Sequence, residues 1–177
     1  MTVAGVVSSI TAVDHALMRR LNHWRPPRWV RWYMVAATRG GDGWLWWLCG
    51  AFILAAQKDD CYRAVAAGTL AGAFGILLFR LLKTAVKRQR PCQIEPHAWY
   101  DLLPPDQFSF PSGHSLTAFA VATSLGQFYP FALPSLLLCA ASVAISRVVL
   151  GLHFLTDVLA GSLIGALVGY NAAALFR

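Results

Sequence analysis

Residues 64–85 read AVAAGTLAGAFGILLFRLLKTA, an apolar stretch whose only charged residues, Arg80 and Lys83, lie near its end. A helix needs about 20 predominantly apolar residues to cross the ~30 Å hydrocarbon core of a bilayer. Comparable runs lie at 131–149 and 154–176, and shorter ones at 44–57 and 114–129. This pattern predicts an all-α integral membrane helix bundle with about five to six transmembrane helices.

The composition of the whole chain agrees with a membrane protein. The 177 residues are 57% hydrophobic and 13% charged, whereas a soluble domain carries about 25% charged residues. We therefore expect a single membrane-embedded domain, 1–177. The net charge of +7 comes from bases that cluster before residue 40 and between Lys83 and Arg90. Because these bases alternate with membrane-length apolar runs, they favour anionic lipid headgroups as partners and argue against nucleic-acid binding.

Residues 1–40 are expected to form an interfacial N-terminal segment. Ile10, Val13, Leu17 and Leu21 recur at helical spacing, which predicts an amphipathic helix lying on the membrane surface. Such a helix can serve as a simple anchor or as a lid over a site. The segment lacks a basic region ahead of an apolar core, so it does not resemble a cleavable signal peptide.

Two further patterns concern the helices themselves. Residues 38–43 (TRGGDG) interrupt the apolar stretch between 29 and 57, which indicates a broken or re-entrant first span. Its many tryptophans are typical of side chains at the level of the lipid headgroups. Gly161, Gly165 and Gly169 recur every four residues, which predicts a flat face where another helix backbone can approach closely.

Three short strings carry polar and charged residues unusual for so apolar a chain. They are 83–91 (KTAVKRQRP), 111–114 (PSGH) and 146–157 (SRVVLGLHFLTD). Charged groups near the membrane are costly, so their presence indicates a functional site. Because successive spans alternate in direction, all three strings are expected at the same membrane face.

The first string supplies cations. Lys83 offers a point charge and Arg90 a planar fork of donors, a combination suited to phosphate oxygens. Lys87 and Arg88 are expected instead to snorkel toward lipid headgroups.

The other two strings supply histidines and further anion-binding groups. Ser112 is a good helix N-cap and Gly113 lets the backbone amides approach an anion, so that His114, in the first turn, can donate a proton to a leaving group. His153 is expected to begin the last helix, and Asp157 follows it at i+4 on the same helix face. There Asp157 can accept one imidazole N–H and free the other nitrogen for nucleophilic attack. Arg147 can neutralise a transferring phosphoryl group. A purely structural His–Asp pair is the alternative.

Taken together, K-x6-RP, PSGH and SR-x5-H-x3-D resemble the three signature motifs of the type 2 phosphatidic acid phosphatase superfamily, over a catalytic core of about 64–170. The resemblance implies that His153 is a nucleophile that forms a phosphohistidine, Asp157 its partner and His114 the acid for the leaving group. It also implies that water hydrolyses the phosphohistidine in a second step. No metal or other cofactor is implied. The implied phosphate binders are Lys83, Arg90, Ser112, Gly113 and Arg147.

The short chain and its interfacial N-terminus resemble bacterial undecaprenyl pyrophosphate phosphatases, so undecaprenyl pyrophosphate is the expected substrate. Phosphatidylglycerophosphate, phosphatidate and lipid A phosphates are alternatives, as are a lipid phosphotransferase and a phospholipid-binding protein without turnover. The resemblance implies a multi-pass protein of the bacterial inner membrane with the site on its periplasmic face. The positive-inside rule favours the cytoplasmic face, but several of the bases counted are expected to bind phosphate.

Overall fold

The computed structural model describes residues 3–57, 59–94 and 107–177, and within these ranges all regular structure is helical. This confirms the predicted all-α class. Two short turns, the π-helical η1 (Gly40–Trp44) and the 3-10 helix η2 (Pro130–Ala132), join longer elements. The α-helices are α1 (Val3–His23), α2 (Arg28–Arg39), α3 (Leu45–Ala55), α4 (Cys61–Val86), α5 (Pro91–Ile94), α6 (Gly113–Phe128), α7 (Leu133–Val149) and α8 (Leu155–Ala174).

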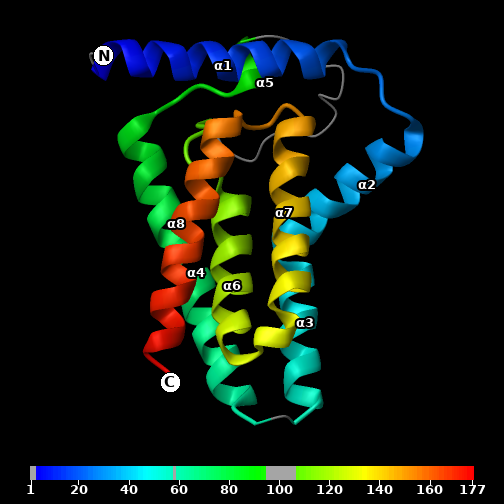
Figure 1. The fold of residues 1–177 in the computed structure, drawn as a ribbon, viewed down its shortest axis with the longest axis vertical. Coiled ribbons are helices and arrows are strands. Elements are labelled where there is room, and N and C mark those ends of the chain that lie inside the picture. Colours follow the sequence, from blue (N-terminus) through cyan, green and yellow to red (C-terminus); the bar gives the residue numbers. More distant parts are fainter. Residues whose placement is uncertain (1–2, 58, 95–106) are drawn as a thin grey trace.

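Helix α6 stands at the centre of an upright bundle and packs against α4, α7 and α8, while α1 lies across one end of that bundle (Figure 1). Among the described residues, the segments Cys61–Ile94, Pro130–Val149 and Leu155–Ala174 are long and apolar enough to cross a membrane. These contain the three longest apolar runs of the sequence. The expected number of crossings, about five to six, stays a prediction.

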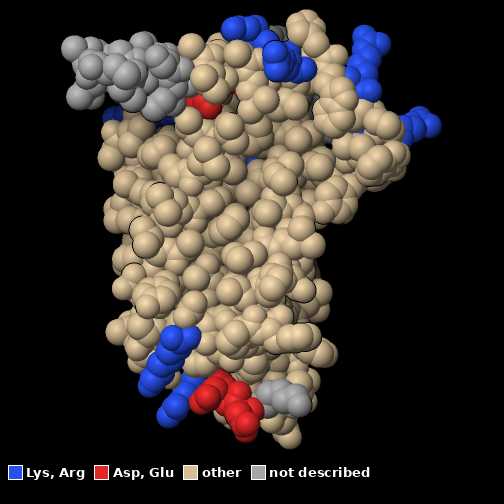
Figure 2. All heavy atoms as spheres, in the orientation of Figure 1, with Lys and Arg blue, Asp and Glu red and all other residues tan. Residues whose placement is uncertain are grey.

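The outer wall of the bundle is apolar, as lipid contact requires. Exposed side chains include Phe74, Leu77, Leu138, Leu163 and Leu167, whereas small residues dominate the interior. Charged side chains gather at the two ends of the molecule, and the broad band between them is almost entirely uncharged in the view of Figure 2. A bilayer would cover this band.

The glycine stripe of α8 brings two helix backbones into contact. A Cβ atom added at Gly165 would lie 2.2 Å from the carbonyl oxygen of Leu116, and one at Gly161 would lie 2.6 Å from that of Ser112. The predicted packing face is therefore confirmed, with α6 as its partner. At the end of this contact the Ser112 amide donates to the carbonyl of Asp157 at 3.0 Å. The close packing thus aligns the start of α6 with the start of α8.

The predicted N-terminal amphipathic helix is present as α1, but the face that meets the bundle differs from the expected apolar stripe. Val13 is 60% exposed, whereas Asp14 is 2% and Met18 6% exposed. The reason is electrostatic, because Asp14 forms an ion pair with Arg88 at 2.7 Å. A carboxylate therefore lies at the centre of the contact between α1 and the bundle.

The predicted break in the first span is a kink. Helix α2 runs into η1 and then α3, and Gly43 at the kink has a φ of 115°, a conformation that glycine adopts readily. Trp29, Trp32 and Trp47 on either side of this kink are 71–74% exposed. They point outward, as expected for residues that meet lipid headgroups.

Candidate active site

All the predicted site residues lie at the end of the bundle covered by α1. Lys83 is in the last turn of α4 and Arg147 in the last turn of α7. The loop 150–154, which carries His153, follows α7 at the same end, where α6 and α8 begin (Figure 1). A small cavity between α1 and this loop is lined by Leu17, Met18 and His153. Residues from four helices and two loops therefore meet beneath α1.

His153 is buried, with its side chain 1% exposed. Its Nε2 atom lies 3.1 Å from a guanidinium nitrogen of Arg90. Because a guanidinium can only donate, Nε2 accepts this hydrogen bond and the ring proton is on Nδ1. Burial, and then the positive charges of Arg90, Arg147 and Lys83, hold the pKa of His153 well below its ordinary value. The imidazole is therefore neutral at neutral pH, with its lone pair on the nitrogen that faces the cations.

Asp157 lies beside His153 but is held by other groups. Its Oδ2 atom is 3.7 Å from Nδ1 of His153, too far for a hydrogen bond, and Nδ1 forms no hydrogen bond within the described residues. The same oxygen accepts the Phe154 amide at 2.9 Å, and Oδ1 accepts from Arg88 at 2.7 Å. The expected imidazole–carboxylate hydrogen bond is thus not formed.

The two residues are close for a different reason from the one expected. His153 precedes Phe154, the N-cap of α8, so the pair does not share a helix face. Instead the Asp157 carboxylate folds back to cap the amide of Phe154, which places it next to the preceding imidazole.

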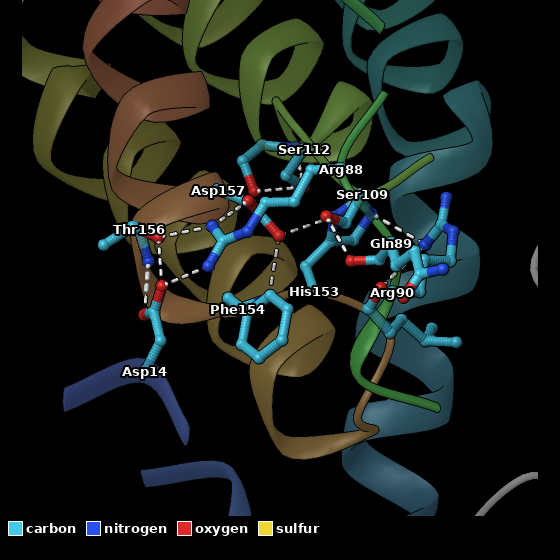
Figure 3. Close-up of polar contacts among 12 residues, drawn as sticks. Asp14, Arg88, Gln89, Arg90, Ser109, Ser112, His153, Phe154, Thr156 and Asp157 are labelled. Carbon is cyan, nitrogen blue, oxygen red and sulfur yellow. Dashed lines mark hydrogen bonds and ion pairs between the residues drawn. The ribbon is translucent and has the colours of Figure 1, made fainter. Parts of the chain in front are cut away.

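Arg88 is central to the site, and its predicted snorkelling to headgroups is wrong. Its guanidinium donates to Thr156 at 2.8 Å and to Asp157 and Asp14 at 2.7 Å each (Figure 3). The guanidinium carbon also lies 4.2 Å from the centre of the Phe154 ring. Asp14 in turn accepts the Thr156 amide at 3.1 Å and its hydroxyl. Arg88 therefore ties α1 to the carboxylate beside His153.

Three buried cations surround the imidazole. Arg90 is 1%, Arg147 4% and Lys83 6% exposed, and the charge of each acts on His153. Arg90 also donates to the carbonyl of Leu152 at 2.7 Å, which fixes the guanidinium next to Nε2. Arg147 donates to Thr38 of α2. A cluster of three cations can bind several oxygens of one group, so this arrangement suits a multiply charged anion such as phosphate.

The start of α6 matches the prediction in part. Ser112 is the N-cap, and its hydroxyl accepts from the Ser115 amide and hydroxyl at 3.4 and 2.9 Å. Since the Ser112 amide is also bonded, to Asp157, this residue is engaged inside the protein. Of the predicted anion cradle there remain the first-turn amides of Gly113 and His114, which by helix geometry have no intrahelical acceptor.

His114 has a partner that the sequence analysis did not identify. Its Nε2 atom lies 2.7 Å from a carboxylate oxygen of Asp42, in the kink η1. The side chain of His114 is 20% exposed and that of Asp42 55%, so this histidine is at the more open side of the site.

The residues missed by the sequence analysis, Asp14, Thr38, Asp42 and Thr156, come from segments far from their partners in the chain. Local pattern carries no signal for such pairs. A single acid within an apolar stretch, as at Asp42, is the one feature that could have indicated a functional position.

Known proteins resemble this chain in sequence and in fold. The sequence model of the PAP2 superfamily, the type 2 phosphatidic acid phosphatases, matches residues 61–177. The chain belongs to the PAP2 superfamily. It is a membrane lipid phosphatase, as the three motifs implied, and a bacterial membrane protein.

Individual relatives of this PAP2 phosphatase agree along almost its whole length. It is 32% identical to decaprenylphosphoryl-5-phosphoribose phosphatase of Mycobacterium tuberculosis, over 93% of this chain and 87% of that protein. A transmembrane PAP2-type phosphatidylglycerolphosphate phosphatase from Bacillus subtilis superposes with a TM-score of 0.75 and 27% identity, covering 94% and 86% of the two chains. LpxE of Aquifex aeolicus superposes with a TM-score of 0.76 and 28% identity, covering 90% and 94%.

Proposed function

We propose that this PAP2 phosphatase removes a phosphate from a membrane lipid without a metal ion, through a phosphohistidine formed on Nε2 of His153. The observation that carries the proposal is the buried, neutral imidazole whose lone pair faces Arg90, with Lys83 and Arg147 nearby. A neutral imidazole is a nucleophile, and the three cations can bind the phosphate that it attacks.

In the first step Nε2 of His153 attacks phosphorus while the bond from phosphorus to the lipid oxygen breaks. Arg90, Lys83 and Arg147 bind the remaining phosphoryl oxygens, and the amides of Gly113 and His114 add to this cradle. His114 gives its proton to the departing lipid oxygen. The products are the dephosphorylated lipid and a phosphohistidine.

In the second step a water molecule attacks phosphorus, and the bond from phosphorus to Nε2 breaks. His114, now neutral, takes a proton from this water. Inorganic phosphate leaves and His153 returns to its neutral form.

Asp157 acts through charge in this scheme. Attack by Nε2 leaves the His153 ring positively charged, and the carboxylate at 3.7 Å from Nδ1 stabilises that charge. Arg88 and the Phe154 amide hold the carboxylate in place. Asp14, in α1, belongs to the same network, which supports treating 1–177 as one membrane-embedded domain around a core at 64–170.

For the lipid we propose a polyprenyl chain that carries a terminal phosphate. Undecaprenyl pyrophosphate is the substrate expected from the sequence. The relative that matches over 93% of the chain is named for a decaprenyl lipid that carries a phosphorylated ribose. This similarity includes much of the region before residue 61, where Leu17 and Met18 of α1 line the cavity at His153. Phosphatidylglycerophosphate, phosphatidate and lipid A phosphates are the competing lipids.

For the membrane we propose the bacterial inner membrane, with the site on the periplasmic face as the resemblance implies. The exposed bases of α1 and α2, such as Arg19, Arg20 and Arg28, lie toward the end that α1 covers and argue for the other face. Since anionic headgroups of either leaflet can bind them, we give the resemblance greater weight. The C-terminus lies at the opposite end (Figure 1), so a reporter fused after Arg177 should be cytoplasmic. A periplasmic reporter would refute this orientation.

The test is phosphate release by purified protein in detergent with EDTA, from each of these lipids, beside His153→Ala. Phosphate release from a polyprenyl lipid by the wild type, with no release by His153→Ala, supports the proposal. Release that persists in His153→Ala refutes the nucleophile, and phosphate that appears on an acceptor lipid identifies a phosphotransferase instead.

A further inference from the structure

The acid histidine of the proposed mechanism has a carboxylate of its own. Asp42 lies in the sequence Gly40-Gly41-Asp42-Gly43, within the kink between α2 and α3. Its Oδ1 atom is 2.7 Å from Nε2 of His114, a strong charge-assisted distance. Asp42 is the one acid in the sequence between Asp14 and Asp59, and acids near a membrane-spanning segment often mark a functional position.

The kink is shaped to bring Asp42 to the imidazole. Gly41 is buried so tightly that an added Cβ would lie 2.6 Å from Val143 and 3.0 Å from Cδ2 of His114. The backbone of η1 therefore lies against the Cδ2 edge of the ring. With Nε2 on Asp42, the Nδ1 edge faces away from Gly41.

This geometry determines which ring nitrogen of His114 carries a proton at each step. When the ring is cationic, Nε2–H donates to Asp42 and Nδ1–H is available to a leaving group. After Nδ1 gives up that proton, the neutral ring keeps Nε2–H on Asp42 and has a lone pair on Nδ1. The same atom can then accept a proton from water, so acid and base are one nitrogen held in one orientation.

The surrounding charges make such a partner necessary. Burial, and then the positive charges of Arg147 and Lys83, disfavour the cationic form of His114. Asp42 is the carboxylate that opposes them. Without Asp42, the ring would lose the group that favours its cationic form and would be free to turn when the leaving group needs a proton.

We propose that Asp42 is a positioning residue for the reaction: by binding Nε2 of His114 it stabilises the imidazolium and directs Nδ1 toward the leaving oxygen and, later, the attacking water. The site then contains two His–carboxylate pairs with separate tasks, Asp157 beside the nucleophile and Asp42 on the acid. This inference rests on the proposed function.

The test uses two substrates with different need for an acid. A long-chain alkyl phosphate leaves as an alkoxide and needs a proton, whereas a nitrophenyl phosphate with a long alkyl chain on its ring leaves without one. In Asp42→Asn we expect turnover of the alkyl phosphate to fall by about 10²- to 10³-fold.

With the aryl substrate the same variant should release one equivalent of nitrophenol at nearly the wild-type rate and then slow down. The reason is that the first step no longer needs the acid, while hydrolysis of the phosphohistidine still needs the base. Asp42→Glu should restore part of the alkyl phosphate turnover. Asp60→Asn, an exposed acid paired with Arg63 at the other end, is the matched control and should behave as wild type.

The outcomes separate the two proposals. If Asp42→Asn slows the aryl burst as much as the alkyl reaction, or leaves both unchanged, Asp42 does not position the acid. A variant that fails to fold is recognised by its unfolding temperature, and the folded Asp42→Glu variant then decides. Rates near wild type with both substrates support the pair, and so does a retained nitrophenol burst with reduced alkyl phosphate turnover. Equal losses with both substrates refute it. If wild type turns over neither substrate, or His153→Ala keeps its burst, the proposed function fails.

Discussion

Replacing Arg88 with glutamine tests the link between the N-terminal helix and the chemistry. The guanidinium binds Asp14 and Asp157, whose side chains are both 0% exposed, at 2.7 Å each. A hydrogen bond to a charged group contributes about 1.5–3 kcal/mol, and breaking a buried ion pair costs about 3–5 kcal/mol because a buried charge is left without its partner. We therefore expect Arg88→Gln to lower the free energy of unfolding by about 3–5 kcal/mol.

Activity should fall as well, because Asp157 keeps the Phe154 amide but loses its cation. If the bond from Arg88 to Asp157 contributes about 1.5–3 kcal/mol to the correct placement of the carboxylate, kcat falls by about 10- to 100-fold. The assay is phosphate release at saturating lipid, corrected for the folded fraction, beside thermal unfolding in detergent.

Lys87→Gln is the matched control. Lys87 is the neighbouring base and is exposed, so its loss should change neither quantity. Equal behaviour of the two variants would refute the network, and a destabilised Arg88→Gln with normal kcat would separate α1 docking from catalysis. In the double variant with Asp14→Asn the losses in stability should not add, because the two residues share one interaction.

Four further predictions follow from the site and the bundle. Asp157→Asn should lower kcat by about 10²- to 10⁴-fold with the fold retained; a rate near wild type would contradict the role of the carboxylate. Because the pKa of His153 lies well below its ordinary value of 6.5, the nucleophile stays neutral as the pH falls through that value. The acid limb of kcat, which does not report ionisation of the free lipid phosphate, should therefore lie below 6.5, and a limb above 6.5 at saturating lipid would contradict a neutral buried nucleophile. EDTA should change phosphate release by less than about twofold because cationic side chains bind the phosphate, and loss restored by Mg²⁺ would show otherwise. Gly165→Val should destabilise the bundle by about 3 kcal/mol or more through overpacking, whereas Leu163→Ala on the exposed face should unfold at nearly the wild-type temperature.

Much of the fold could be predicted because membrane helices are specified by local sequence. The apolar runs at 64–85, 131–149 and 154–176 correspond to α4, α7 and α8 within a few residues. Backbone groups in lipid must satisfy one another, which leaves helices as the structure for such runs. The face of α1 that packs on the bundle was predicted wrongly at Val13. Hydrophobic periodicity cannot show that the neighbouring acid, Asp14, forms a buried ion pair with Arg88.

The site could be predicted only where its motifs are contiguous. Lys83, Arg90, Arg147, His153 and Asp157 are recognisable from spacing, and alternating spans explain why they meet. The contact between Asp157 and His153 was expected on a helix face, whereas a helix cap produces it, because α8 starts after His153. Arg88 resembled a surface base since its partners lie 74 and 69 positions away in the chain.

By itself, then, the amino-acid sequence determined the membrane character, the helices, the convergence of three motifs on one end of the bundle and the family. These follow from local hydropathy and from residue spacing. Only the tertiary structure decided which carboxylate meets which cation or imidazole: Asp14 with Arg88, and Asp42 with His114. The physical reason is that an ion pair depends on the separation of its charges in space and on their burial, and both arise only when α1 and the kink η1 pack against the ends of helices formed much later in the chain.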